Sequence, residues 1–86
     1  MEGPLELWQG MMGIGGWSRR YFVLNGAVLG CYDRRSGTIE TEINLKVSTL
    51  KKSKKKNNQF TIMTGRSRYR LKTESEELRG KWMETL

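Results

Sequence analysis

The sequence predicts a mainly β domain, in which seven short antiparallel strands form a small barrel that one C-terminal helix closes. The chain has 86 residues, which is room for one domain with one modest core. Short segments rich in β-branched and aromatic residues alternate with turn residues as far as residue 73, and a helical pattern follows. A meander of short strands protects its edges by curling into a barrel, and a helix can cover one opening.

The expected strands begin with a short one around Leu5 and Leu7, which leads into a flexible loop containing Gly10, Gly13, Gly15 and Gly16. The further strands are expected at residues 17–24, 27–32, 38–45, 47–50, 60–64 and 68–73, with a loop at 33–37. The hairpin signals are Asn25-Gly26, the strongest in the chain, and Gly65.

The strand at residues 17–24 carries two neighbouring arginines. Successive side chains of a strand point to opposite faces, so Arg20 shares a face with Phe22, and Arg19 lies on the other face with Tyr21. Only one of the two arginines can therefore face a given pocket.

The last segment is expected to be an amphipathic helix from about residue 75. Ser75 is a suitable cap with acidic residues after it, and Leu78, Trp82 and Leu86 recur at helical spacing. We expect Trp82 to pack in the core across the barrel opening. Cys31 is expected at the inner wall of its strand, where a free thiol behaves as a small apolar group.

The charge of the chain is strongly basic. Sixteen Lys and Arg against nine Asp and Glu leave a formal net charge of +7, which indicates an anionic partner: phospholipid, nucleic acid or acidic protein. The alternative is a merely soluble basic surface. Five lysines stand in one run, expected to be a solvated loop that ends at Asn58: Lys51, Lys52, Lys54, Lys55 and Lys56.

Several function classes are excluded by what the sequence lacks. A single cysteine permits no intrachain disulfide and favours an intracellular setting. There is no run of 18 apolar residues and no signal-peptide pattern at the start, so membrane contact is expected to be peripheral. Without histidine, Cys/His metal spacing or a phosphate loop, no enzymatic activity, metal or cofactor is expected.

Apolar residues in the glycine-rich segment form a candidate membrane-inserting wedge. Met11, Met12 and Ile14 have no evident core to join, and methionine adapts well to an irregular lipid interface. The alternative is that these side chains fold back onto Trp8 or Trp17.

The residues in order and spacing resemble one known family. The matching segments are residues 3–5, the string Gly16-Trp17-Ser18-Arg19-Arg20-Tyr21-Phe22-Val23-Leu24-Asn25-Gly26, and residues 29–32, 43–45, 69–75 and 81–82. They cover essentially the whole chain and resemble the pleckstrin homology (PH) domains. The resemblance implies a seven-stranded barrel of two packed sheets capped by one helix. It also implies a single domain over residues 1–86, with a helix that is cut short and a larger parent protein.

The opening residues and the Gly16-Trp17 entry to the second strand are similar to the subgroup found in Golgi-directed, oxysterol-binding-type lipid-transfer proteins. That subgroup implies recognition of phosphatidylinositol 4-phosphate, with the first loop dipping into the bilayer. The expected location is therefore cytoplasmic, peripheral on a Golgi, endosomal or plasma membrane.

The resemblance also implies where a headgroup phosphate would bind. Leu7 and Ser18 stand where the family usually has basic residues, which leaves Arg20 as the remaining position of the basic signature. A guanidinium there can chelate a phosphate through two hydrogen bonds. Arg34 and Arg35, on the adjacent loop, are expected to compensate for the two missing positions.

Other basic residues are expected to act less specifically. Arg19 and the lysine run would add general attraction to an anionic leaflet. The alternative for Arg20 is a structural ion pair with Glu6 or Asp33, and the alternative for the lysine run is a solvated loop that protects a barrel edge.

Two rival classes remain beside lipid docking. Loss of the usual basic pair favours a protein-binding module on the same fold, with a small GTPase or another protein co-receptor as partner. Nucleic-acid binding is suggested by the net charge and the aromatic residues, but the lysine run lacks interleaved aromatics, so no nucleic-acid partner is expected.

Overall fold

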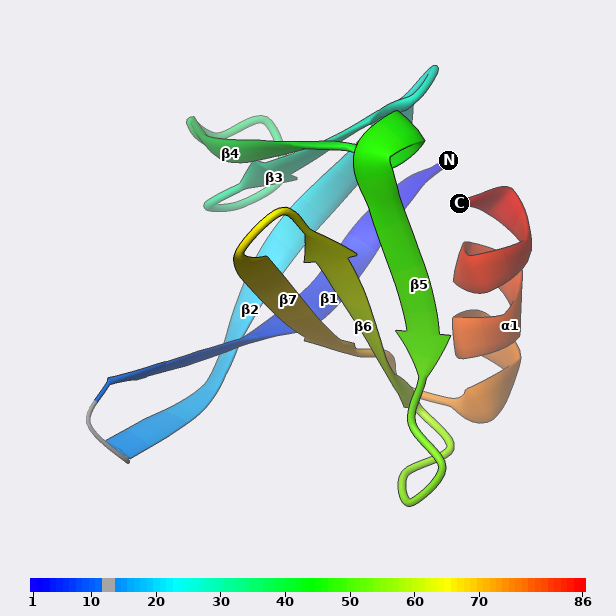
Figure 1. Cartoon of the computed structure of the whole chain (residues 1–86). Helices are drawn as coiled ribbons and strands as arrows, with labels where there is room; N and C mark the ends of the chain where they lie inside the picture. Colours follow the sequence, from blue (N-terminus) through cyan, green and yellow to red (C-terminus); the bar gives the residue numbers. More distant parts are fainter. Residues whose placement is uncertain (12–13) are drawn as a thin grey trace.

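One antiparallel sheet curls around the core, and a single helix lies beside it (Figure 1). The computed structural model describes residues 1–11 and 14–86. The elements in chain order are β1 (Glu2–Met11), β2 (Ile14–Asn25), β3 (Val28–Tyr32), β4 (Ile39–Asn44), the 3₁₀ turn η1 (Leu45–Val47), β5 (Ser48–Lys52), β6 (Gln59–Thr64), β7 (Ser67–Lys72) and α1 (Glu76–Thr85). The mainly β prediction with a C-terminal helix is confirmed.

The expected division into two packed sheets is replaced by one continuous sheet. Its strand order is β4-β3-β2-β1-β7-β6-β5. One half of the sheet contains β1 to β4 and the other half contains β5 to β7. The two halves meet where β1 pairs with β7, through only Glu6↔Lys72 and Leu7↔Leu71. So short a junction lets the sheet turn sharply and enclose the core.

Two glycines make the hairpin turns that the sequence predicts. Gly26 has φ +63° in the turn between β2 and β3, and Gly65 has φ +56° between β6 and β7. Only glycine adopts such values of φ at no steric cost, which explains why both turns form at these residues.

The glycine-rich segment was expected to be a loop, and this expectation is wrong over most of its length. β1 and β2 remain paired as far as Met11↔Ile14, and Gly10 lies opposite Gly15. A Cβ on Gly15 would stand 2.7 Å from the indole of Trp8, so the missing side chain lets that ring cross the neighbouring strand. The outer part of this hairpin, residues 8–11 and 14–17, projects from the barrel (Figure 1), and we call it the hairpin arm.

The core lies between the concave face of the sheet and α1. Its buried residues are Leu5, Leu7, Phe22, Leu29, Cys31, Ile43, Phe60, Ile62, Leu71 and Trp82. The predicted positions of Cys31 and Trp82 are confirmed. The helix pattern was partly wrong, because Leu78 is 36% exposed whereas Arg79 is buried, with 7% exposed. Ser75 caps the helix as expected, and its Oγ accepts a hydrogen bond from the Leu78 amide.

The lysine run does not begin in a loop. β5 continues through Lys51 and Lys52, which pair with Thr61 and Phe60 of β6. The register of the sheet therefore sets where the first two lysines point, and only residues 53–58 form the connecting loop, which we call the lysine loop.

Candidate functional site

The three arginines predicted as headgroup ligands gather at one cavity with Arg19, which was predicted to add general attraction. We call it the arginine pocket; it has a volume of about 330 Å³ and is lined by Pro4, Arg19, Arg20, Tyr21, Asp33, Arg34 and Arg35. β2 supplies the first pair of arginines, and the loop after β3 supplies the second pair. The predicted arginines therefore lie together in space. The prediction that only one of Arg19 and Arg20 can face a given pocket is wrong, because both line this cavity.

Carboxylates already occupy most of these guanidinium groups. Arg20 Nε donates to Glu40 Oε1 at 2.6 Å, and its Nη2 donates to the side-chain oxygen of Gln9 at 3.2 Å. Arg34 lies 3.6 Å from Asp33. The expected alternative partners of Arg20, Glu6 and Asp33, are wrong, because β4 brings Glu40 to it instead. A phosphate at Arg20 would have to compete with this carboxylate.

The other two arginines of the pocket are more open. Arg19 is 68% exposed at the side chain, and its nearest carboxylate, on Glu74, is 3.9 Å away. Arg35 has no carboxylate partner within the described part of the chain. It lies near Tyr21, whose pKa is raised mainly by the hydrogen bond that its hydroxyl donates to Glu2; the positive charge of Arg35 opposes this rise.

Cys31 lies beneath the Arg20–Glu40 pair. Burial, and after it the negative charge of Glu40, raises the pKa of the Cys31 thiol from 9.0 to about 11, while Arg20 acts in the opposite direction. The thiol is thus neutral at physiological pH, and it serves as an apolar core group and not as a nucleophile.

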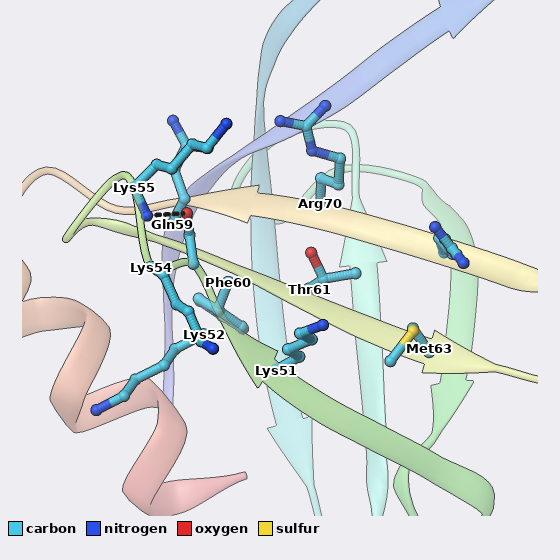
Figure 2. Close-up of a pocket in the computed structure, with 11 residues that line it drawn as sticks. Lys51, Lys52, Lys54, Lys55, Gln59, Phe60, Thr61, Met63 and Arg70 are labelled. Carbon is cyan, nitrogen blue, oxygen red and sulfur yellow. Dashed lines mark hydrogen bonds between the residues drawn. The ribbon is translucent and has the colours of Figure 1, made fainter.

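A second cationic cavity lies on the outer face of β5, β6 and β7 (Figure 2). We call it the lysine cleft; its volume is about 590 Å³ and it is lined by Lys51, Lys52, Ser53, Lys54, Lys55, Gln59, Phe60, Thr61, Met63, Arg68 and Arg70. Six of these lining residues are cationic and none is acidic. This composition distinguishes the lysine cleft from the arginine pocket, where carboxylates are built in.

The lysine cleft continues along one row of outward side chains. Lys51 of β5 pairs with Thr61 of β6, which pairs with Arg70 of β7. In the next strands the row continues with Trp8, whose indole lies 5.2 Å from the Arg70 guanidinium, and with Trp17, which pairs with Trp8. Two cations and two indoles are therefore aligned across five strands.

Aromatic rings hold the Arg70 guanidinium in place. Trp8 and Trp17 meet edge to face, with ring centroids 5.5 Å apart, and Arg70 lies 5.8 Å from the second ring. Lys72 lies 4.7 Å from the Trp17 ring but is also paired with Glu6 at 3.2 Å. Cation–π contacts of this kind leave the charge of Arg70 available, because they involve no carboxylate.

Exposed apolar groups lie along the hairpin arm beside this row. Trp8 is 37% exposed and Ile14 is 81% exposed. Of the three residues predicted to enter a membrane, Ile14 is thus presented to the exterior. Met12 and the side chain of Met11 lie outside the described residues.

The predicted electrostatic residues lie apart from the predicted headgroup ligands. The lysines line the lysine cleft and a neighbouring cavity of about 530 Å³ beside the start of α1, and none of them lines the arginine pocket. Sequence reasoning missed Arg68 and Arg70 as partners of these lysines. Their signal was the alternation in β7, where each arginine is followed by a residue of the opposite face.

Other kinds of site find no support in the described residues. Residues 1–11 and 14–86 contain no group of three or more acidic, histidine or cysteine side chains arranged to hold a metal. No helix in this described part is both long and apolar enough to cross a membrane.

Comparisons with known proteins match this architecture. A family model for the PH domain matches residues 1–86. The PH domain of human oxysterol binding protein-related protein 11 superposes with a TM-score of 0.83 at 21% identity, covering 99% of this chain and 74% of that one. A chain in the crystal structure of SifA and SKIP gives a TM-score of 0.85 at 22% identity, covering 98% and 90%.

The C-terminal PH domain of pleckstrin, in complex with D-myo-Ins(1,2,3,5,6)P5, gives a TM-score of 0.82 at 25% identity, covering 99% of this chain and 88% of that one. A search of curated proteins found no match. The oxysterol-binding subgroup is one of several kinds of PH neighbour, so the comparisons do not single it out. Because the family model spans the whole sequence, the chain belongs to the PH domain family, whose members are typically non-catalytic binding modules.

Proposed function

We propose that this domain docks peripherally on anionic membranes and that the lysine cleft receives the phosphate groups of a phosphoinositide headgroup. The observation that carries the proposal is the row from Lys51 through Arg70 to Trp8 and Trp17. It places Lys51 and Arg70, which have no carboxylate partner among the described residues, in one row with the exposed Trp8 indole, on the same hairpin arm that carries Ile14. The surface of a bilayer, with anionic headgroups above apolar acyl chains, is complementary to this arrangement of cations and apolar side chains.

Docking on this face combines two contributions. Each lysine close to an anionic leaflet contributes up to about 1 kcal/mol, and this contribution weakens with salt. The hairpin arm contributes through burial of Ile14 and through the indoles, which favour the level of the headgroups. Neither contribution alone gives stable attachment, and together they define how the domain faces the membrane.

The most specific part of the proposal is which phosphoinositide headgroup the domain prefers. The pleckstrin domain that this chain resembles at 25% identity was solved with an inositol pentakisphosphate, which supports an inositol phosphate as ligand class. We propose phosphatidylinositol 4-phosphate as the preferred lipid, because the segment from Gly16 to Arg20 resembles the Golgi-directed subgroup. The corresponding location is the cytoplasmic face of a Golgi, endosomal or plasma membrane.

The arginine pocket is assigned a secondary part in lipid docking. Arg20 can grip a phosphate only if Glu40 moves away, whereas Arg35 is free to contact a headgroup at once. The Arg20 side chain is only 20% exposed and its contact with Glu40 is 2.6 Å long, so displacement of this carboxylate by a phosphate is costly and Arg20 is assigned the smaller part.

The same Arg20–Glu40 pair favours one alternative function, a protein-interaction module. A pocket that already contains carboxylates presents mixed charge, which suits a polar protein surface such as that of a small GTPase co-receptor. The structural neighbour from the SifA–SKIP crystal structure is part of a protein assembly. On this alternative, lipid binding would be weak and non-specific.

The proposal is tested by co-sedimentation with vesicles that each contain one phosphoinositide, compared with phosphatidylserine vesicles of matched charge. The variant Lys54→Gln/Lys55→Gln is compared with Arg34→Gln/Arg35→Gln, because each lowers the net charge of +7 by two. We expect the first to weaken binding about 30-fold, from about 2 kcal/mol, and the second to weaken it much less. Equal losses would contradict the assignment of the cleft, and no pelleting of the wild type would favour the protein-interaction alternative.

A further inference from the structure

Arg79 is a nearly buried cation whose function the membrane contact does not explain. Its side chain is 9% exposed, in the middle of α1. A buried charge is costly unless hydrogen bonds compensate it. The nearest carboxylate, on Glu76, is 3.7 Å away and 66% exposed, which makes it a weak partner. The partners that compensate this guanidinium lie elsewhere in the chain.

These partners are two carbonyl groups of the lysine loop and the carbonyl of Gln59, the first residue of β6. Arg79 Nη1 donates to the carbonyl oxygens of Ser53, Lys56 and Gln59 at 3.2, 3.2 and 3.3 Å. The three carbonyls stand before, within and after the run Lys54–Lys56. One guanidinium therefore gathers both sides of the loop toward the helix.

Further hydrogen bonds complete the same arrangement. Ser53 Oγ accepts from the amides of Lys55 and Lys56 at 3.3 and 3.1 Å. Asn58 exchanges hydrogen bonds with Thr73, which ties the far end of the loop to the segment before α1. These hydrogen bonds fix the backbone of the loop on the side that faces the protein. The side chains of Lys54–Lys56 point away from it, and all three residues are exposed.

We infer that Arg79 is a positioning residue for membrane docking, which holds the lysine loop in the conformation that places Lys54 and Lys55 in the lysine cleft. A run of like charges repels itself and spreads when nothing anchors its backbone. Arg79 never touches the lipid and acts only through the carbonyls. The inference rests on the proposed function, because it assigns the cleft as the docking surface.

The decisive variant is Arg79→Lys, which preserves the charge. Its nitrogen ends one bond short of Nη1, and an ammonium is more strongly hydrated than a guanidinium, so we expect it to hold the three carbonyls less well. If the freed loop spends a tenth of the time in the docking conformation, affinity for phosphatidylcholine vesicles containing phosphatidylinositol 4-phosphate falls about tenfold. Hydrogen exchange of the Lys55 and Lys56 amides should accelerate in the same variant.

The matched control is Lys81→Met on the same helix. Lys81 is 61% exposed, and its salt bridge is to Glu77 and not to the loop. This control removes a charge but leaves the loop held, so we expect about a twofold loss of affinity or less and unchanged exchange at Lys55 and Lys56.

Each outcome of the vesicle-binding and hydrogen-exchange measurements either supports or overturns the inference. Faster exchange with weaker vesicle binding in Arg79→Lys supports it, whereas unchanged binding, or unchanged exchange, overturns it. If Arg79→Lys does not fold, Ser53→Ala loosens the same loop without touching the helix, and it must also weaken binding. If the wild type binds no vesicle, the proposed function fails and the docking role fails with it. The exchange data then still decide whether Arg79 holds the loop.

Discussion

Replacement of Ile14 by serine tests whether the hairpin arm enters the bilayer. Ile14 is 81% exposed at the last described pair of the arm, so its side chain makes little contact within the domain. Substitutions at such exposed positions usually change stability by less than about 0.5 kcal/mol. A change in membrane affinity would therefore report on the membrane contact and not on folding.

The expected magnitude follows from the exposed fraction. Burying a whole isoleucine side chain is worth about 1.5 to 3 kcal/mol, and 81% of it remains to be buried in the free domain. Insertion of Ile14 should then contribute roughly 1.2 to 2.4 kcal/mol. Its loss in Ile14→Ser corresponds to a decrease in vesicle affinity of roughly 8- to 60-fold.

The control is Val47→Ser, because Val47 is also aliphatic and strongly exposed, at 67%. It lies in η1, away from the hairpin arm (Figure 1), so its replacement should leave affinity unchanged. Both variants are measured by co-sedimentation with anionic vesicles at physiological salt and again at about 1 M salt, where the Debye length falls to about 3 Å.

Salt separates insertion from charge. Raised salt should lower the vesicle affinity of both the wild type and Ile14→Ser. The ratio of the two affinities should persist, because burial of an apolar group is not screened by salt. If Ile14→Ser binds within about twofold of the wild type, or if Val47→Ser loses as much, the arm does not insert and the reasoning fails.

Three further predictions concern the fold that supports this face. The high pKa of Cys31 means that the folded state keeps its proton while the unfolded chain loses it, so the free energy of unfolding should fall between about pH 9 and 11. In urea titrations this fall should be smaller in Cys31→Ala, by at most about 3 kcal/mol, and an equal fall there would contradict the assignment. Trp82→Ala should cost about 3 to 5 kcal/mol by the same measurement, and a loss below about 1 kcal/mol would show that the helix does not close the core. Gly15→Ala should destabilise the hairpin arm, because the added Cβ would stand 2.8 Å from the Gly10 backbone. The control is Gly16→Ala, whose added Cβ would have no atom within 4 Å. Equal thermal unfolding midpoints for the two variants would refute this prediction.

The outline of the fold could be predicted because its signals are local. Asn25-Gly26 and Gly65 determine two hairpins through their own backbone preferences, and Ser75 begins the helix by capping it. These features depend on a few neighbouring residues, so no knowledge of the distant chain is needed to find them.

The hairpin arm could not be predicted because its glycines serve a partner strand. Taken alone, Gly10 and Gly15 indicate a loop. In the structure they lie opposite each other, and the space above Gly15 is filled by the indole of Trp8. Their function therefore depends on a cross-strand register that local reasoning does not contain.

The candidate site was predicted in part for the same reason. The loop after β3 places Arg34 and Arg35 beside Arg20 as expected, but strand alternation does not keep Arg19 out of that pocket, and the carboxylate of Glu40 arrives from a separate strand. Likewise, helical spacing placed Leu78 on one apolar face with Trp82 and Leu86, whereas the structure exposes Leu78 and buries Arg79. The carbonyls that make burial of that arginine favourable belong to the lysine loop and to the first residue of β6, 20 to 26 positions earlier.

The short junction between β1 and β7 has a consequence for how the domain is made in the cell. Its paired residues, Glu6↔Lys72 and Leu7↔Leu71, lie near opposite ends of the chain, and Trp82 packs close to Gly3 beside it. The local hairpins can form while the ribosome is still at work, but closing this junction must wait for a long-range encounter. Until β7 has been synthesised, one edge of β1 is unpaired and available to chaperones or to wrong partners. The first strand of the sheet is therefore protected only after the seventh strand has emerged.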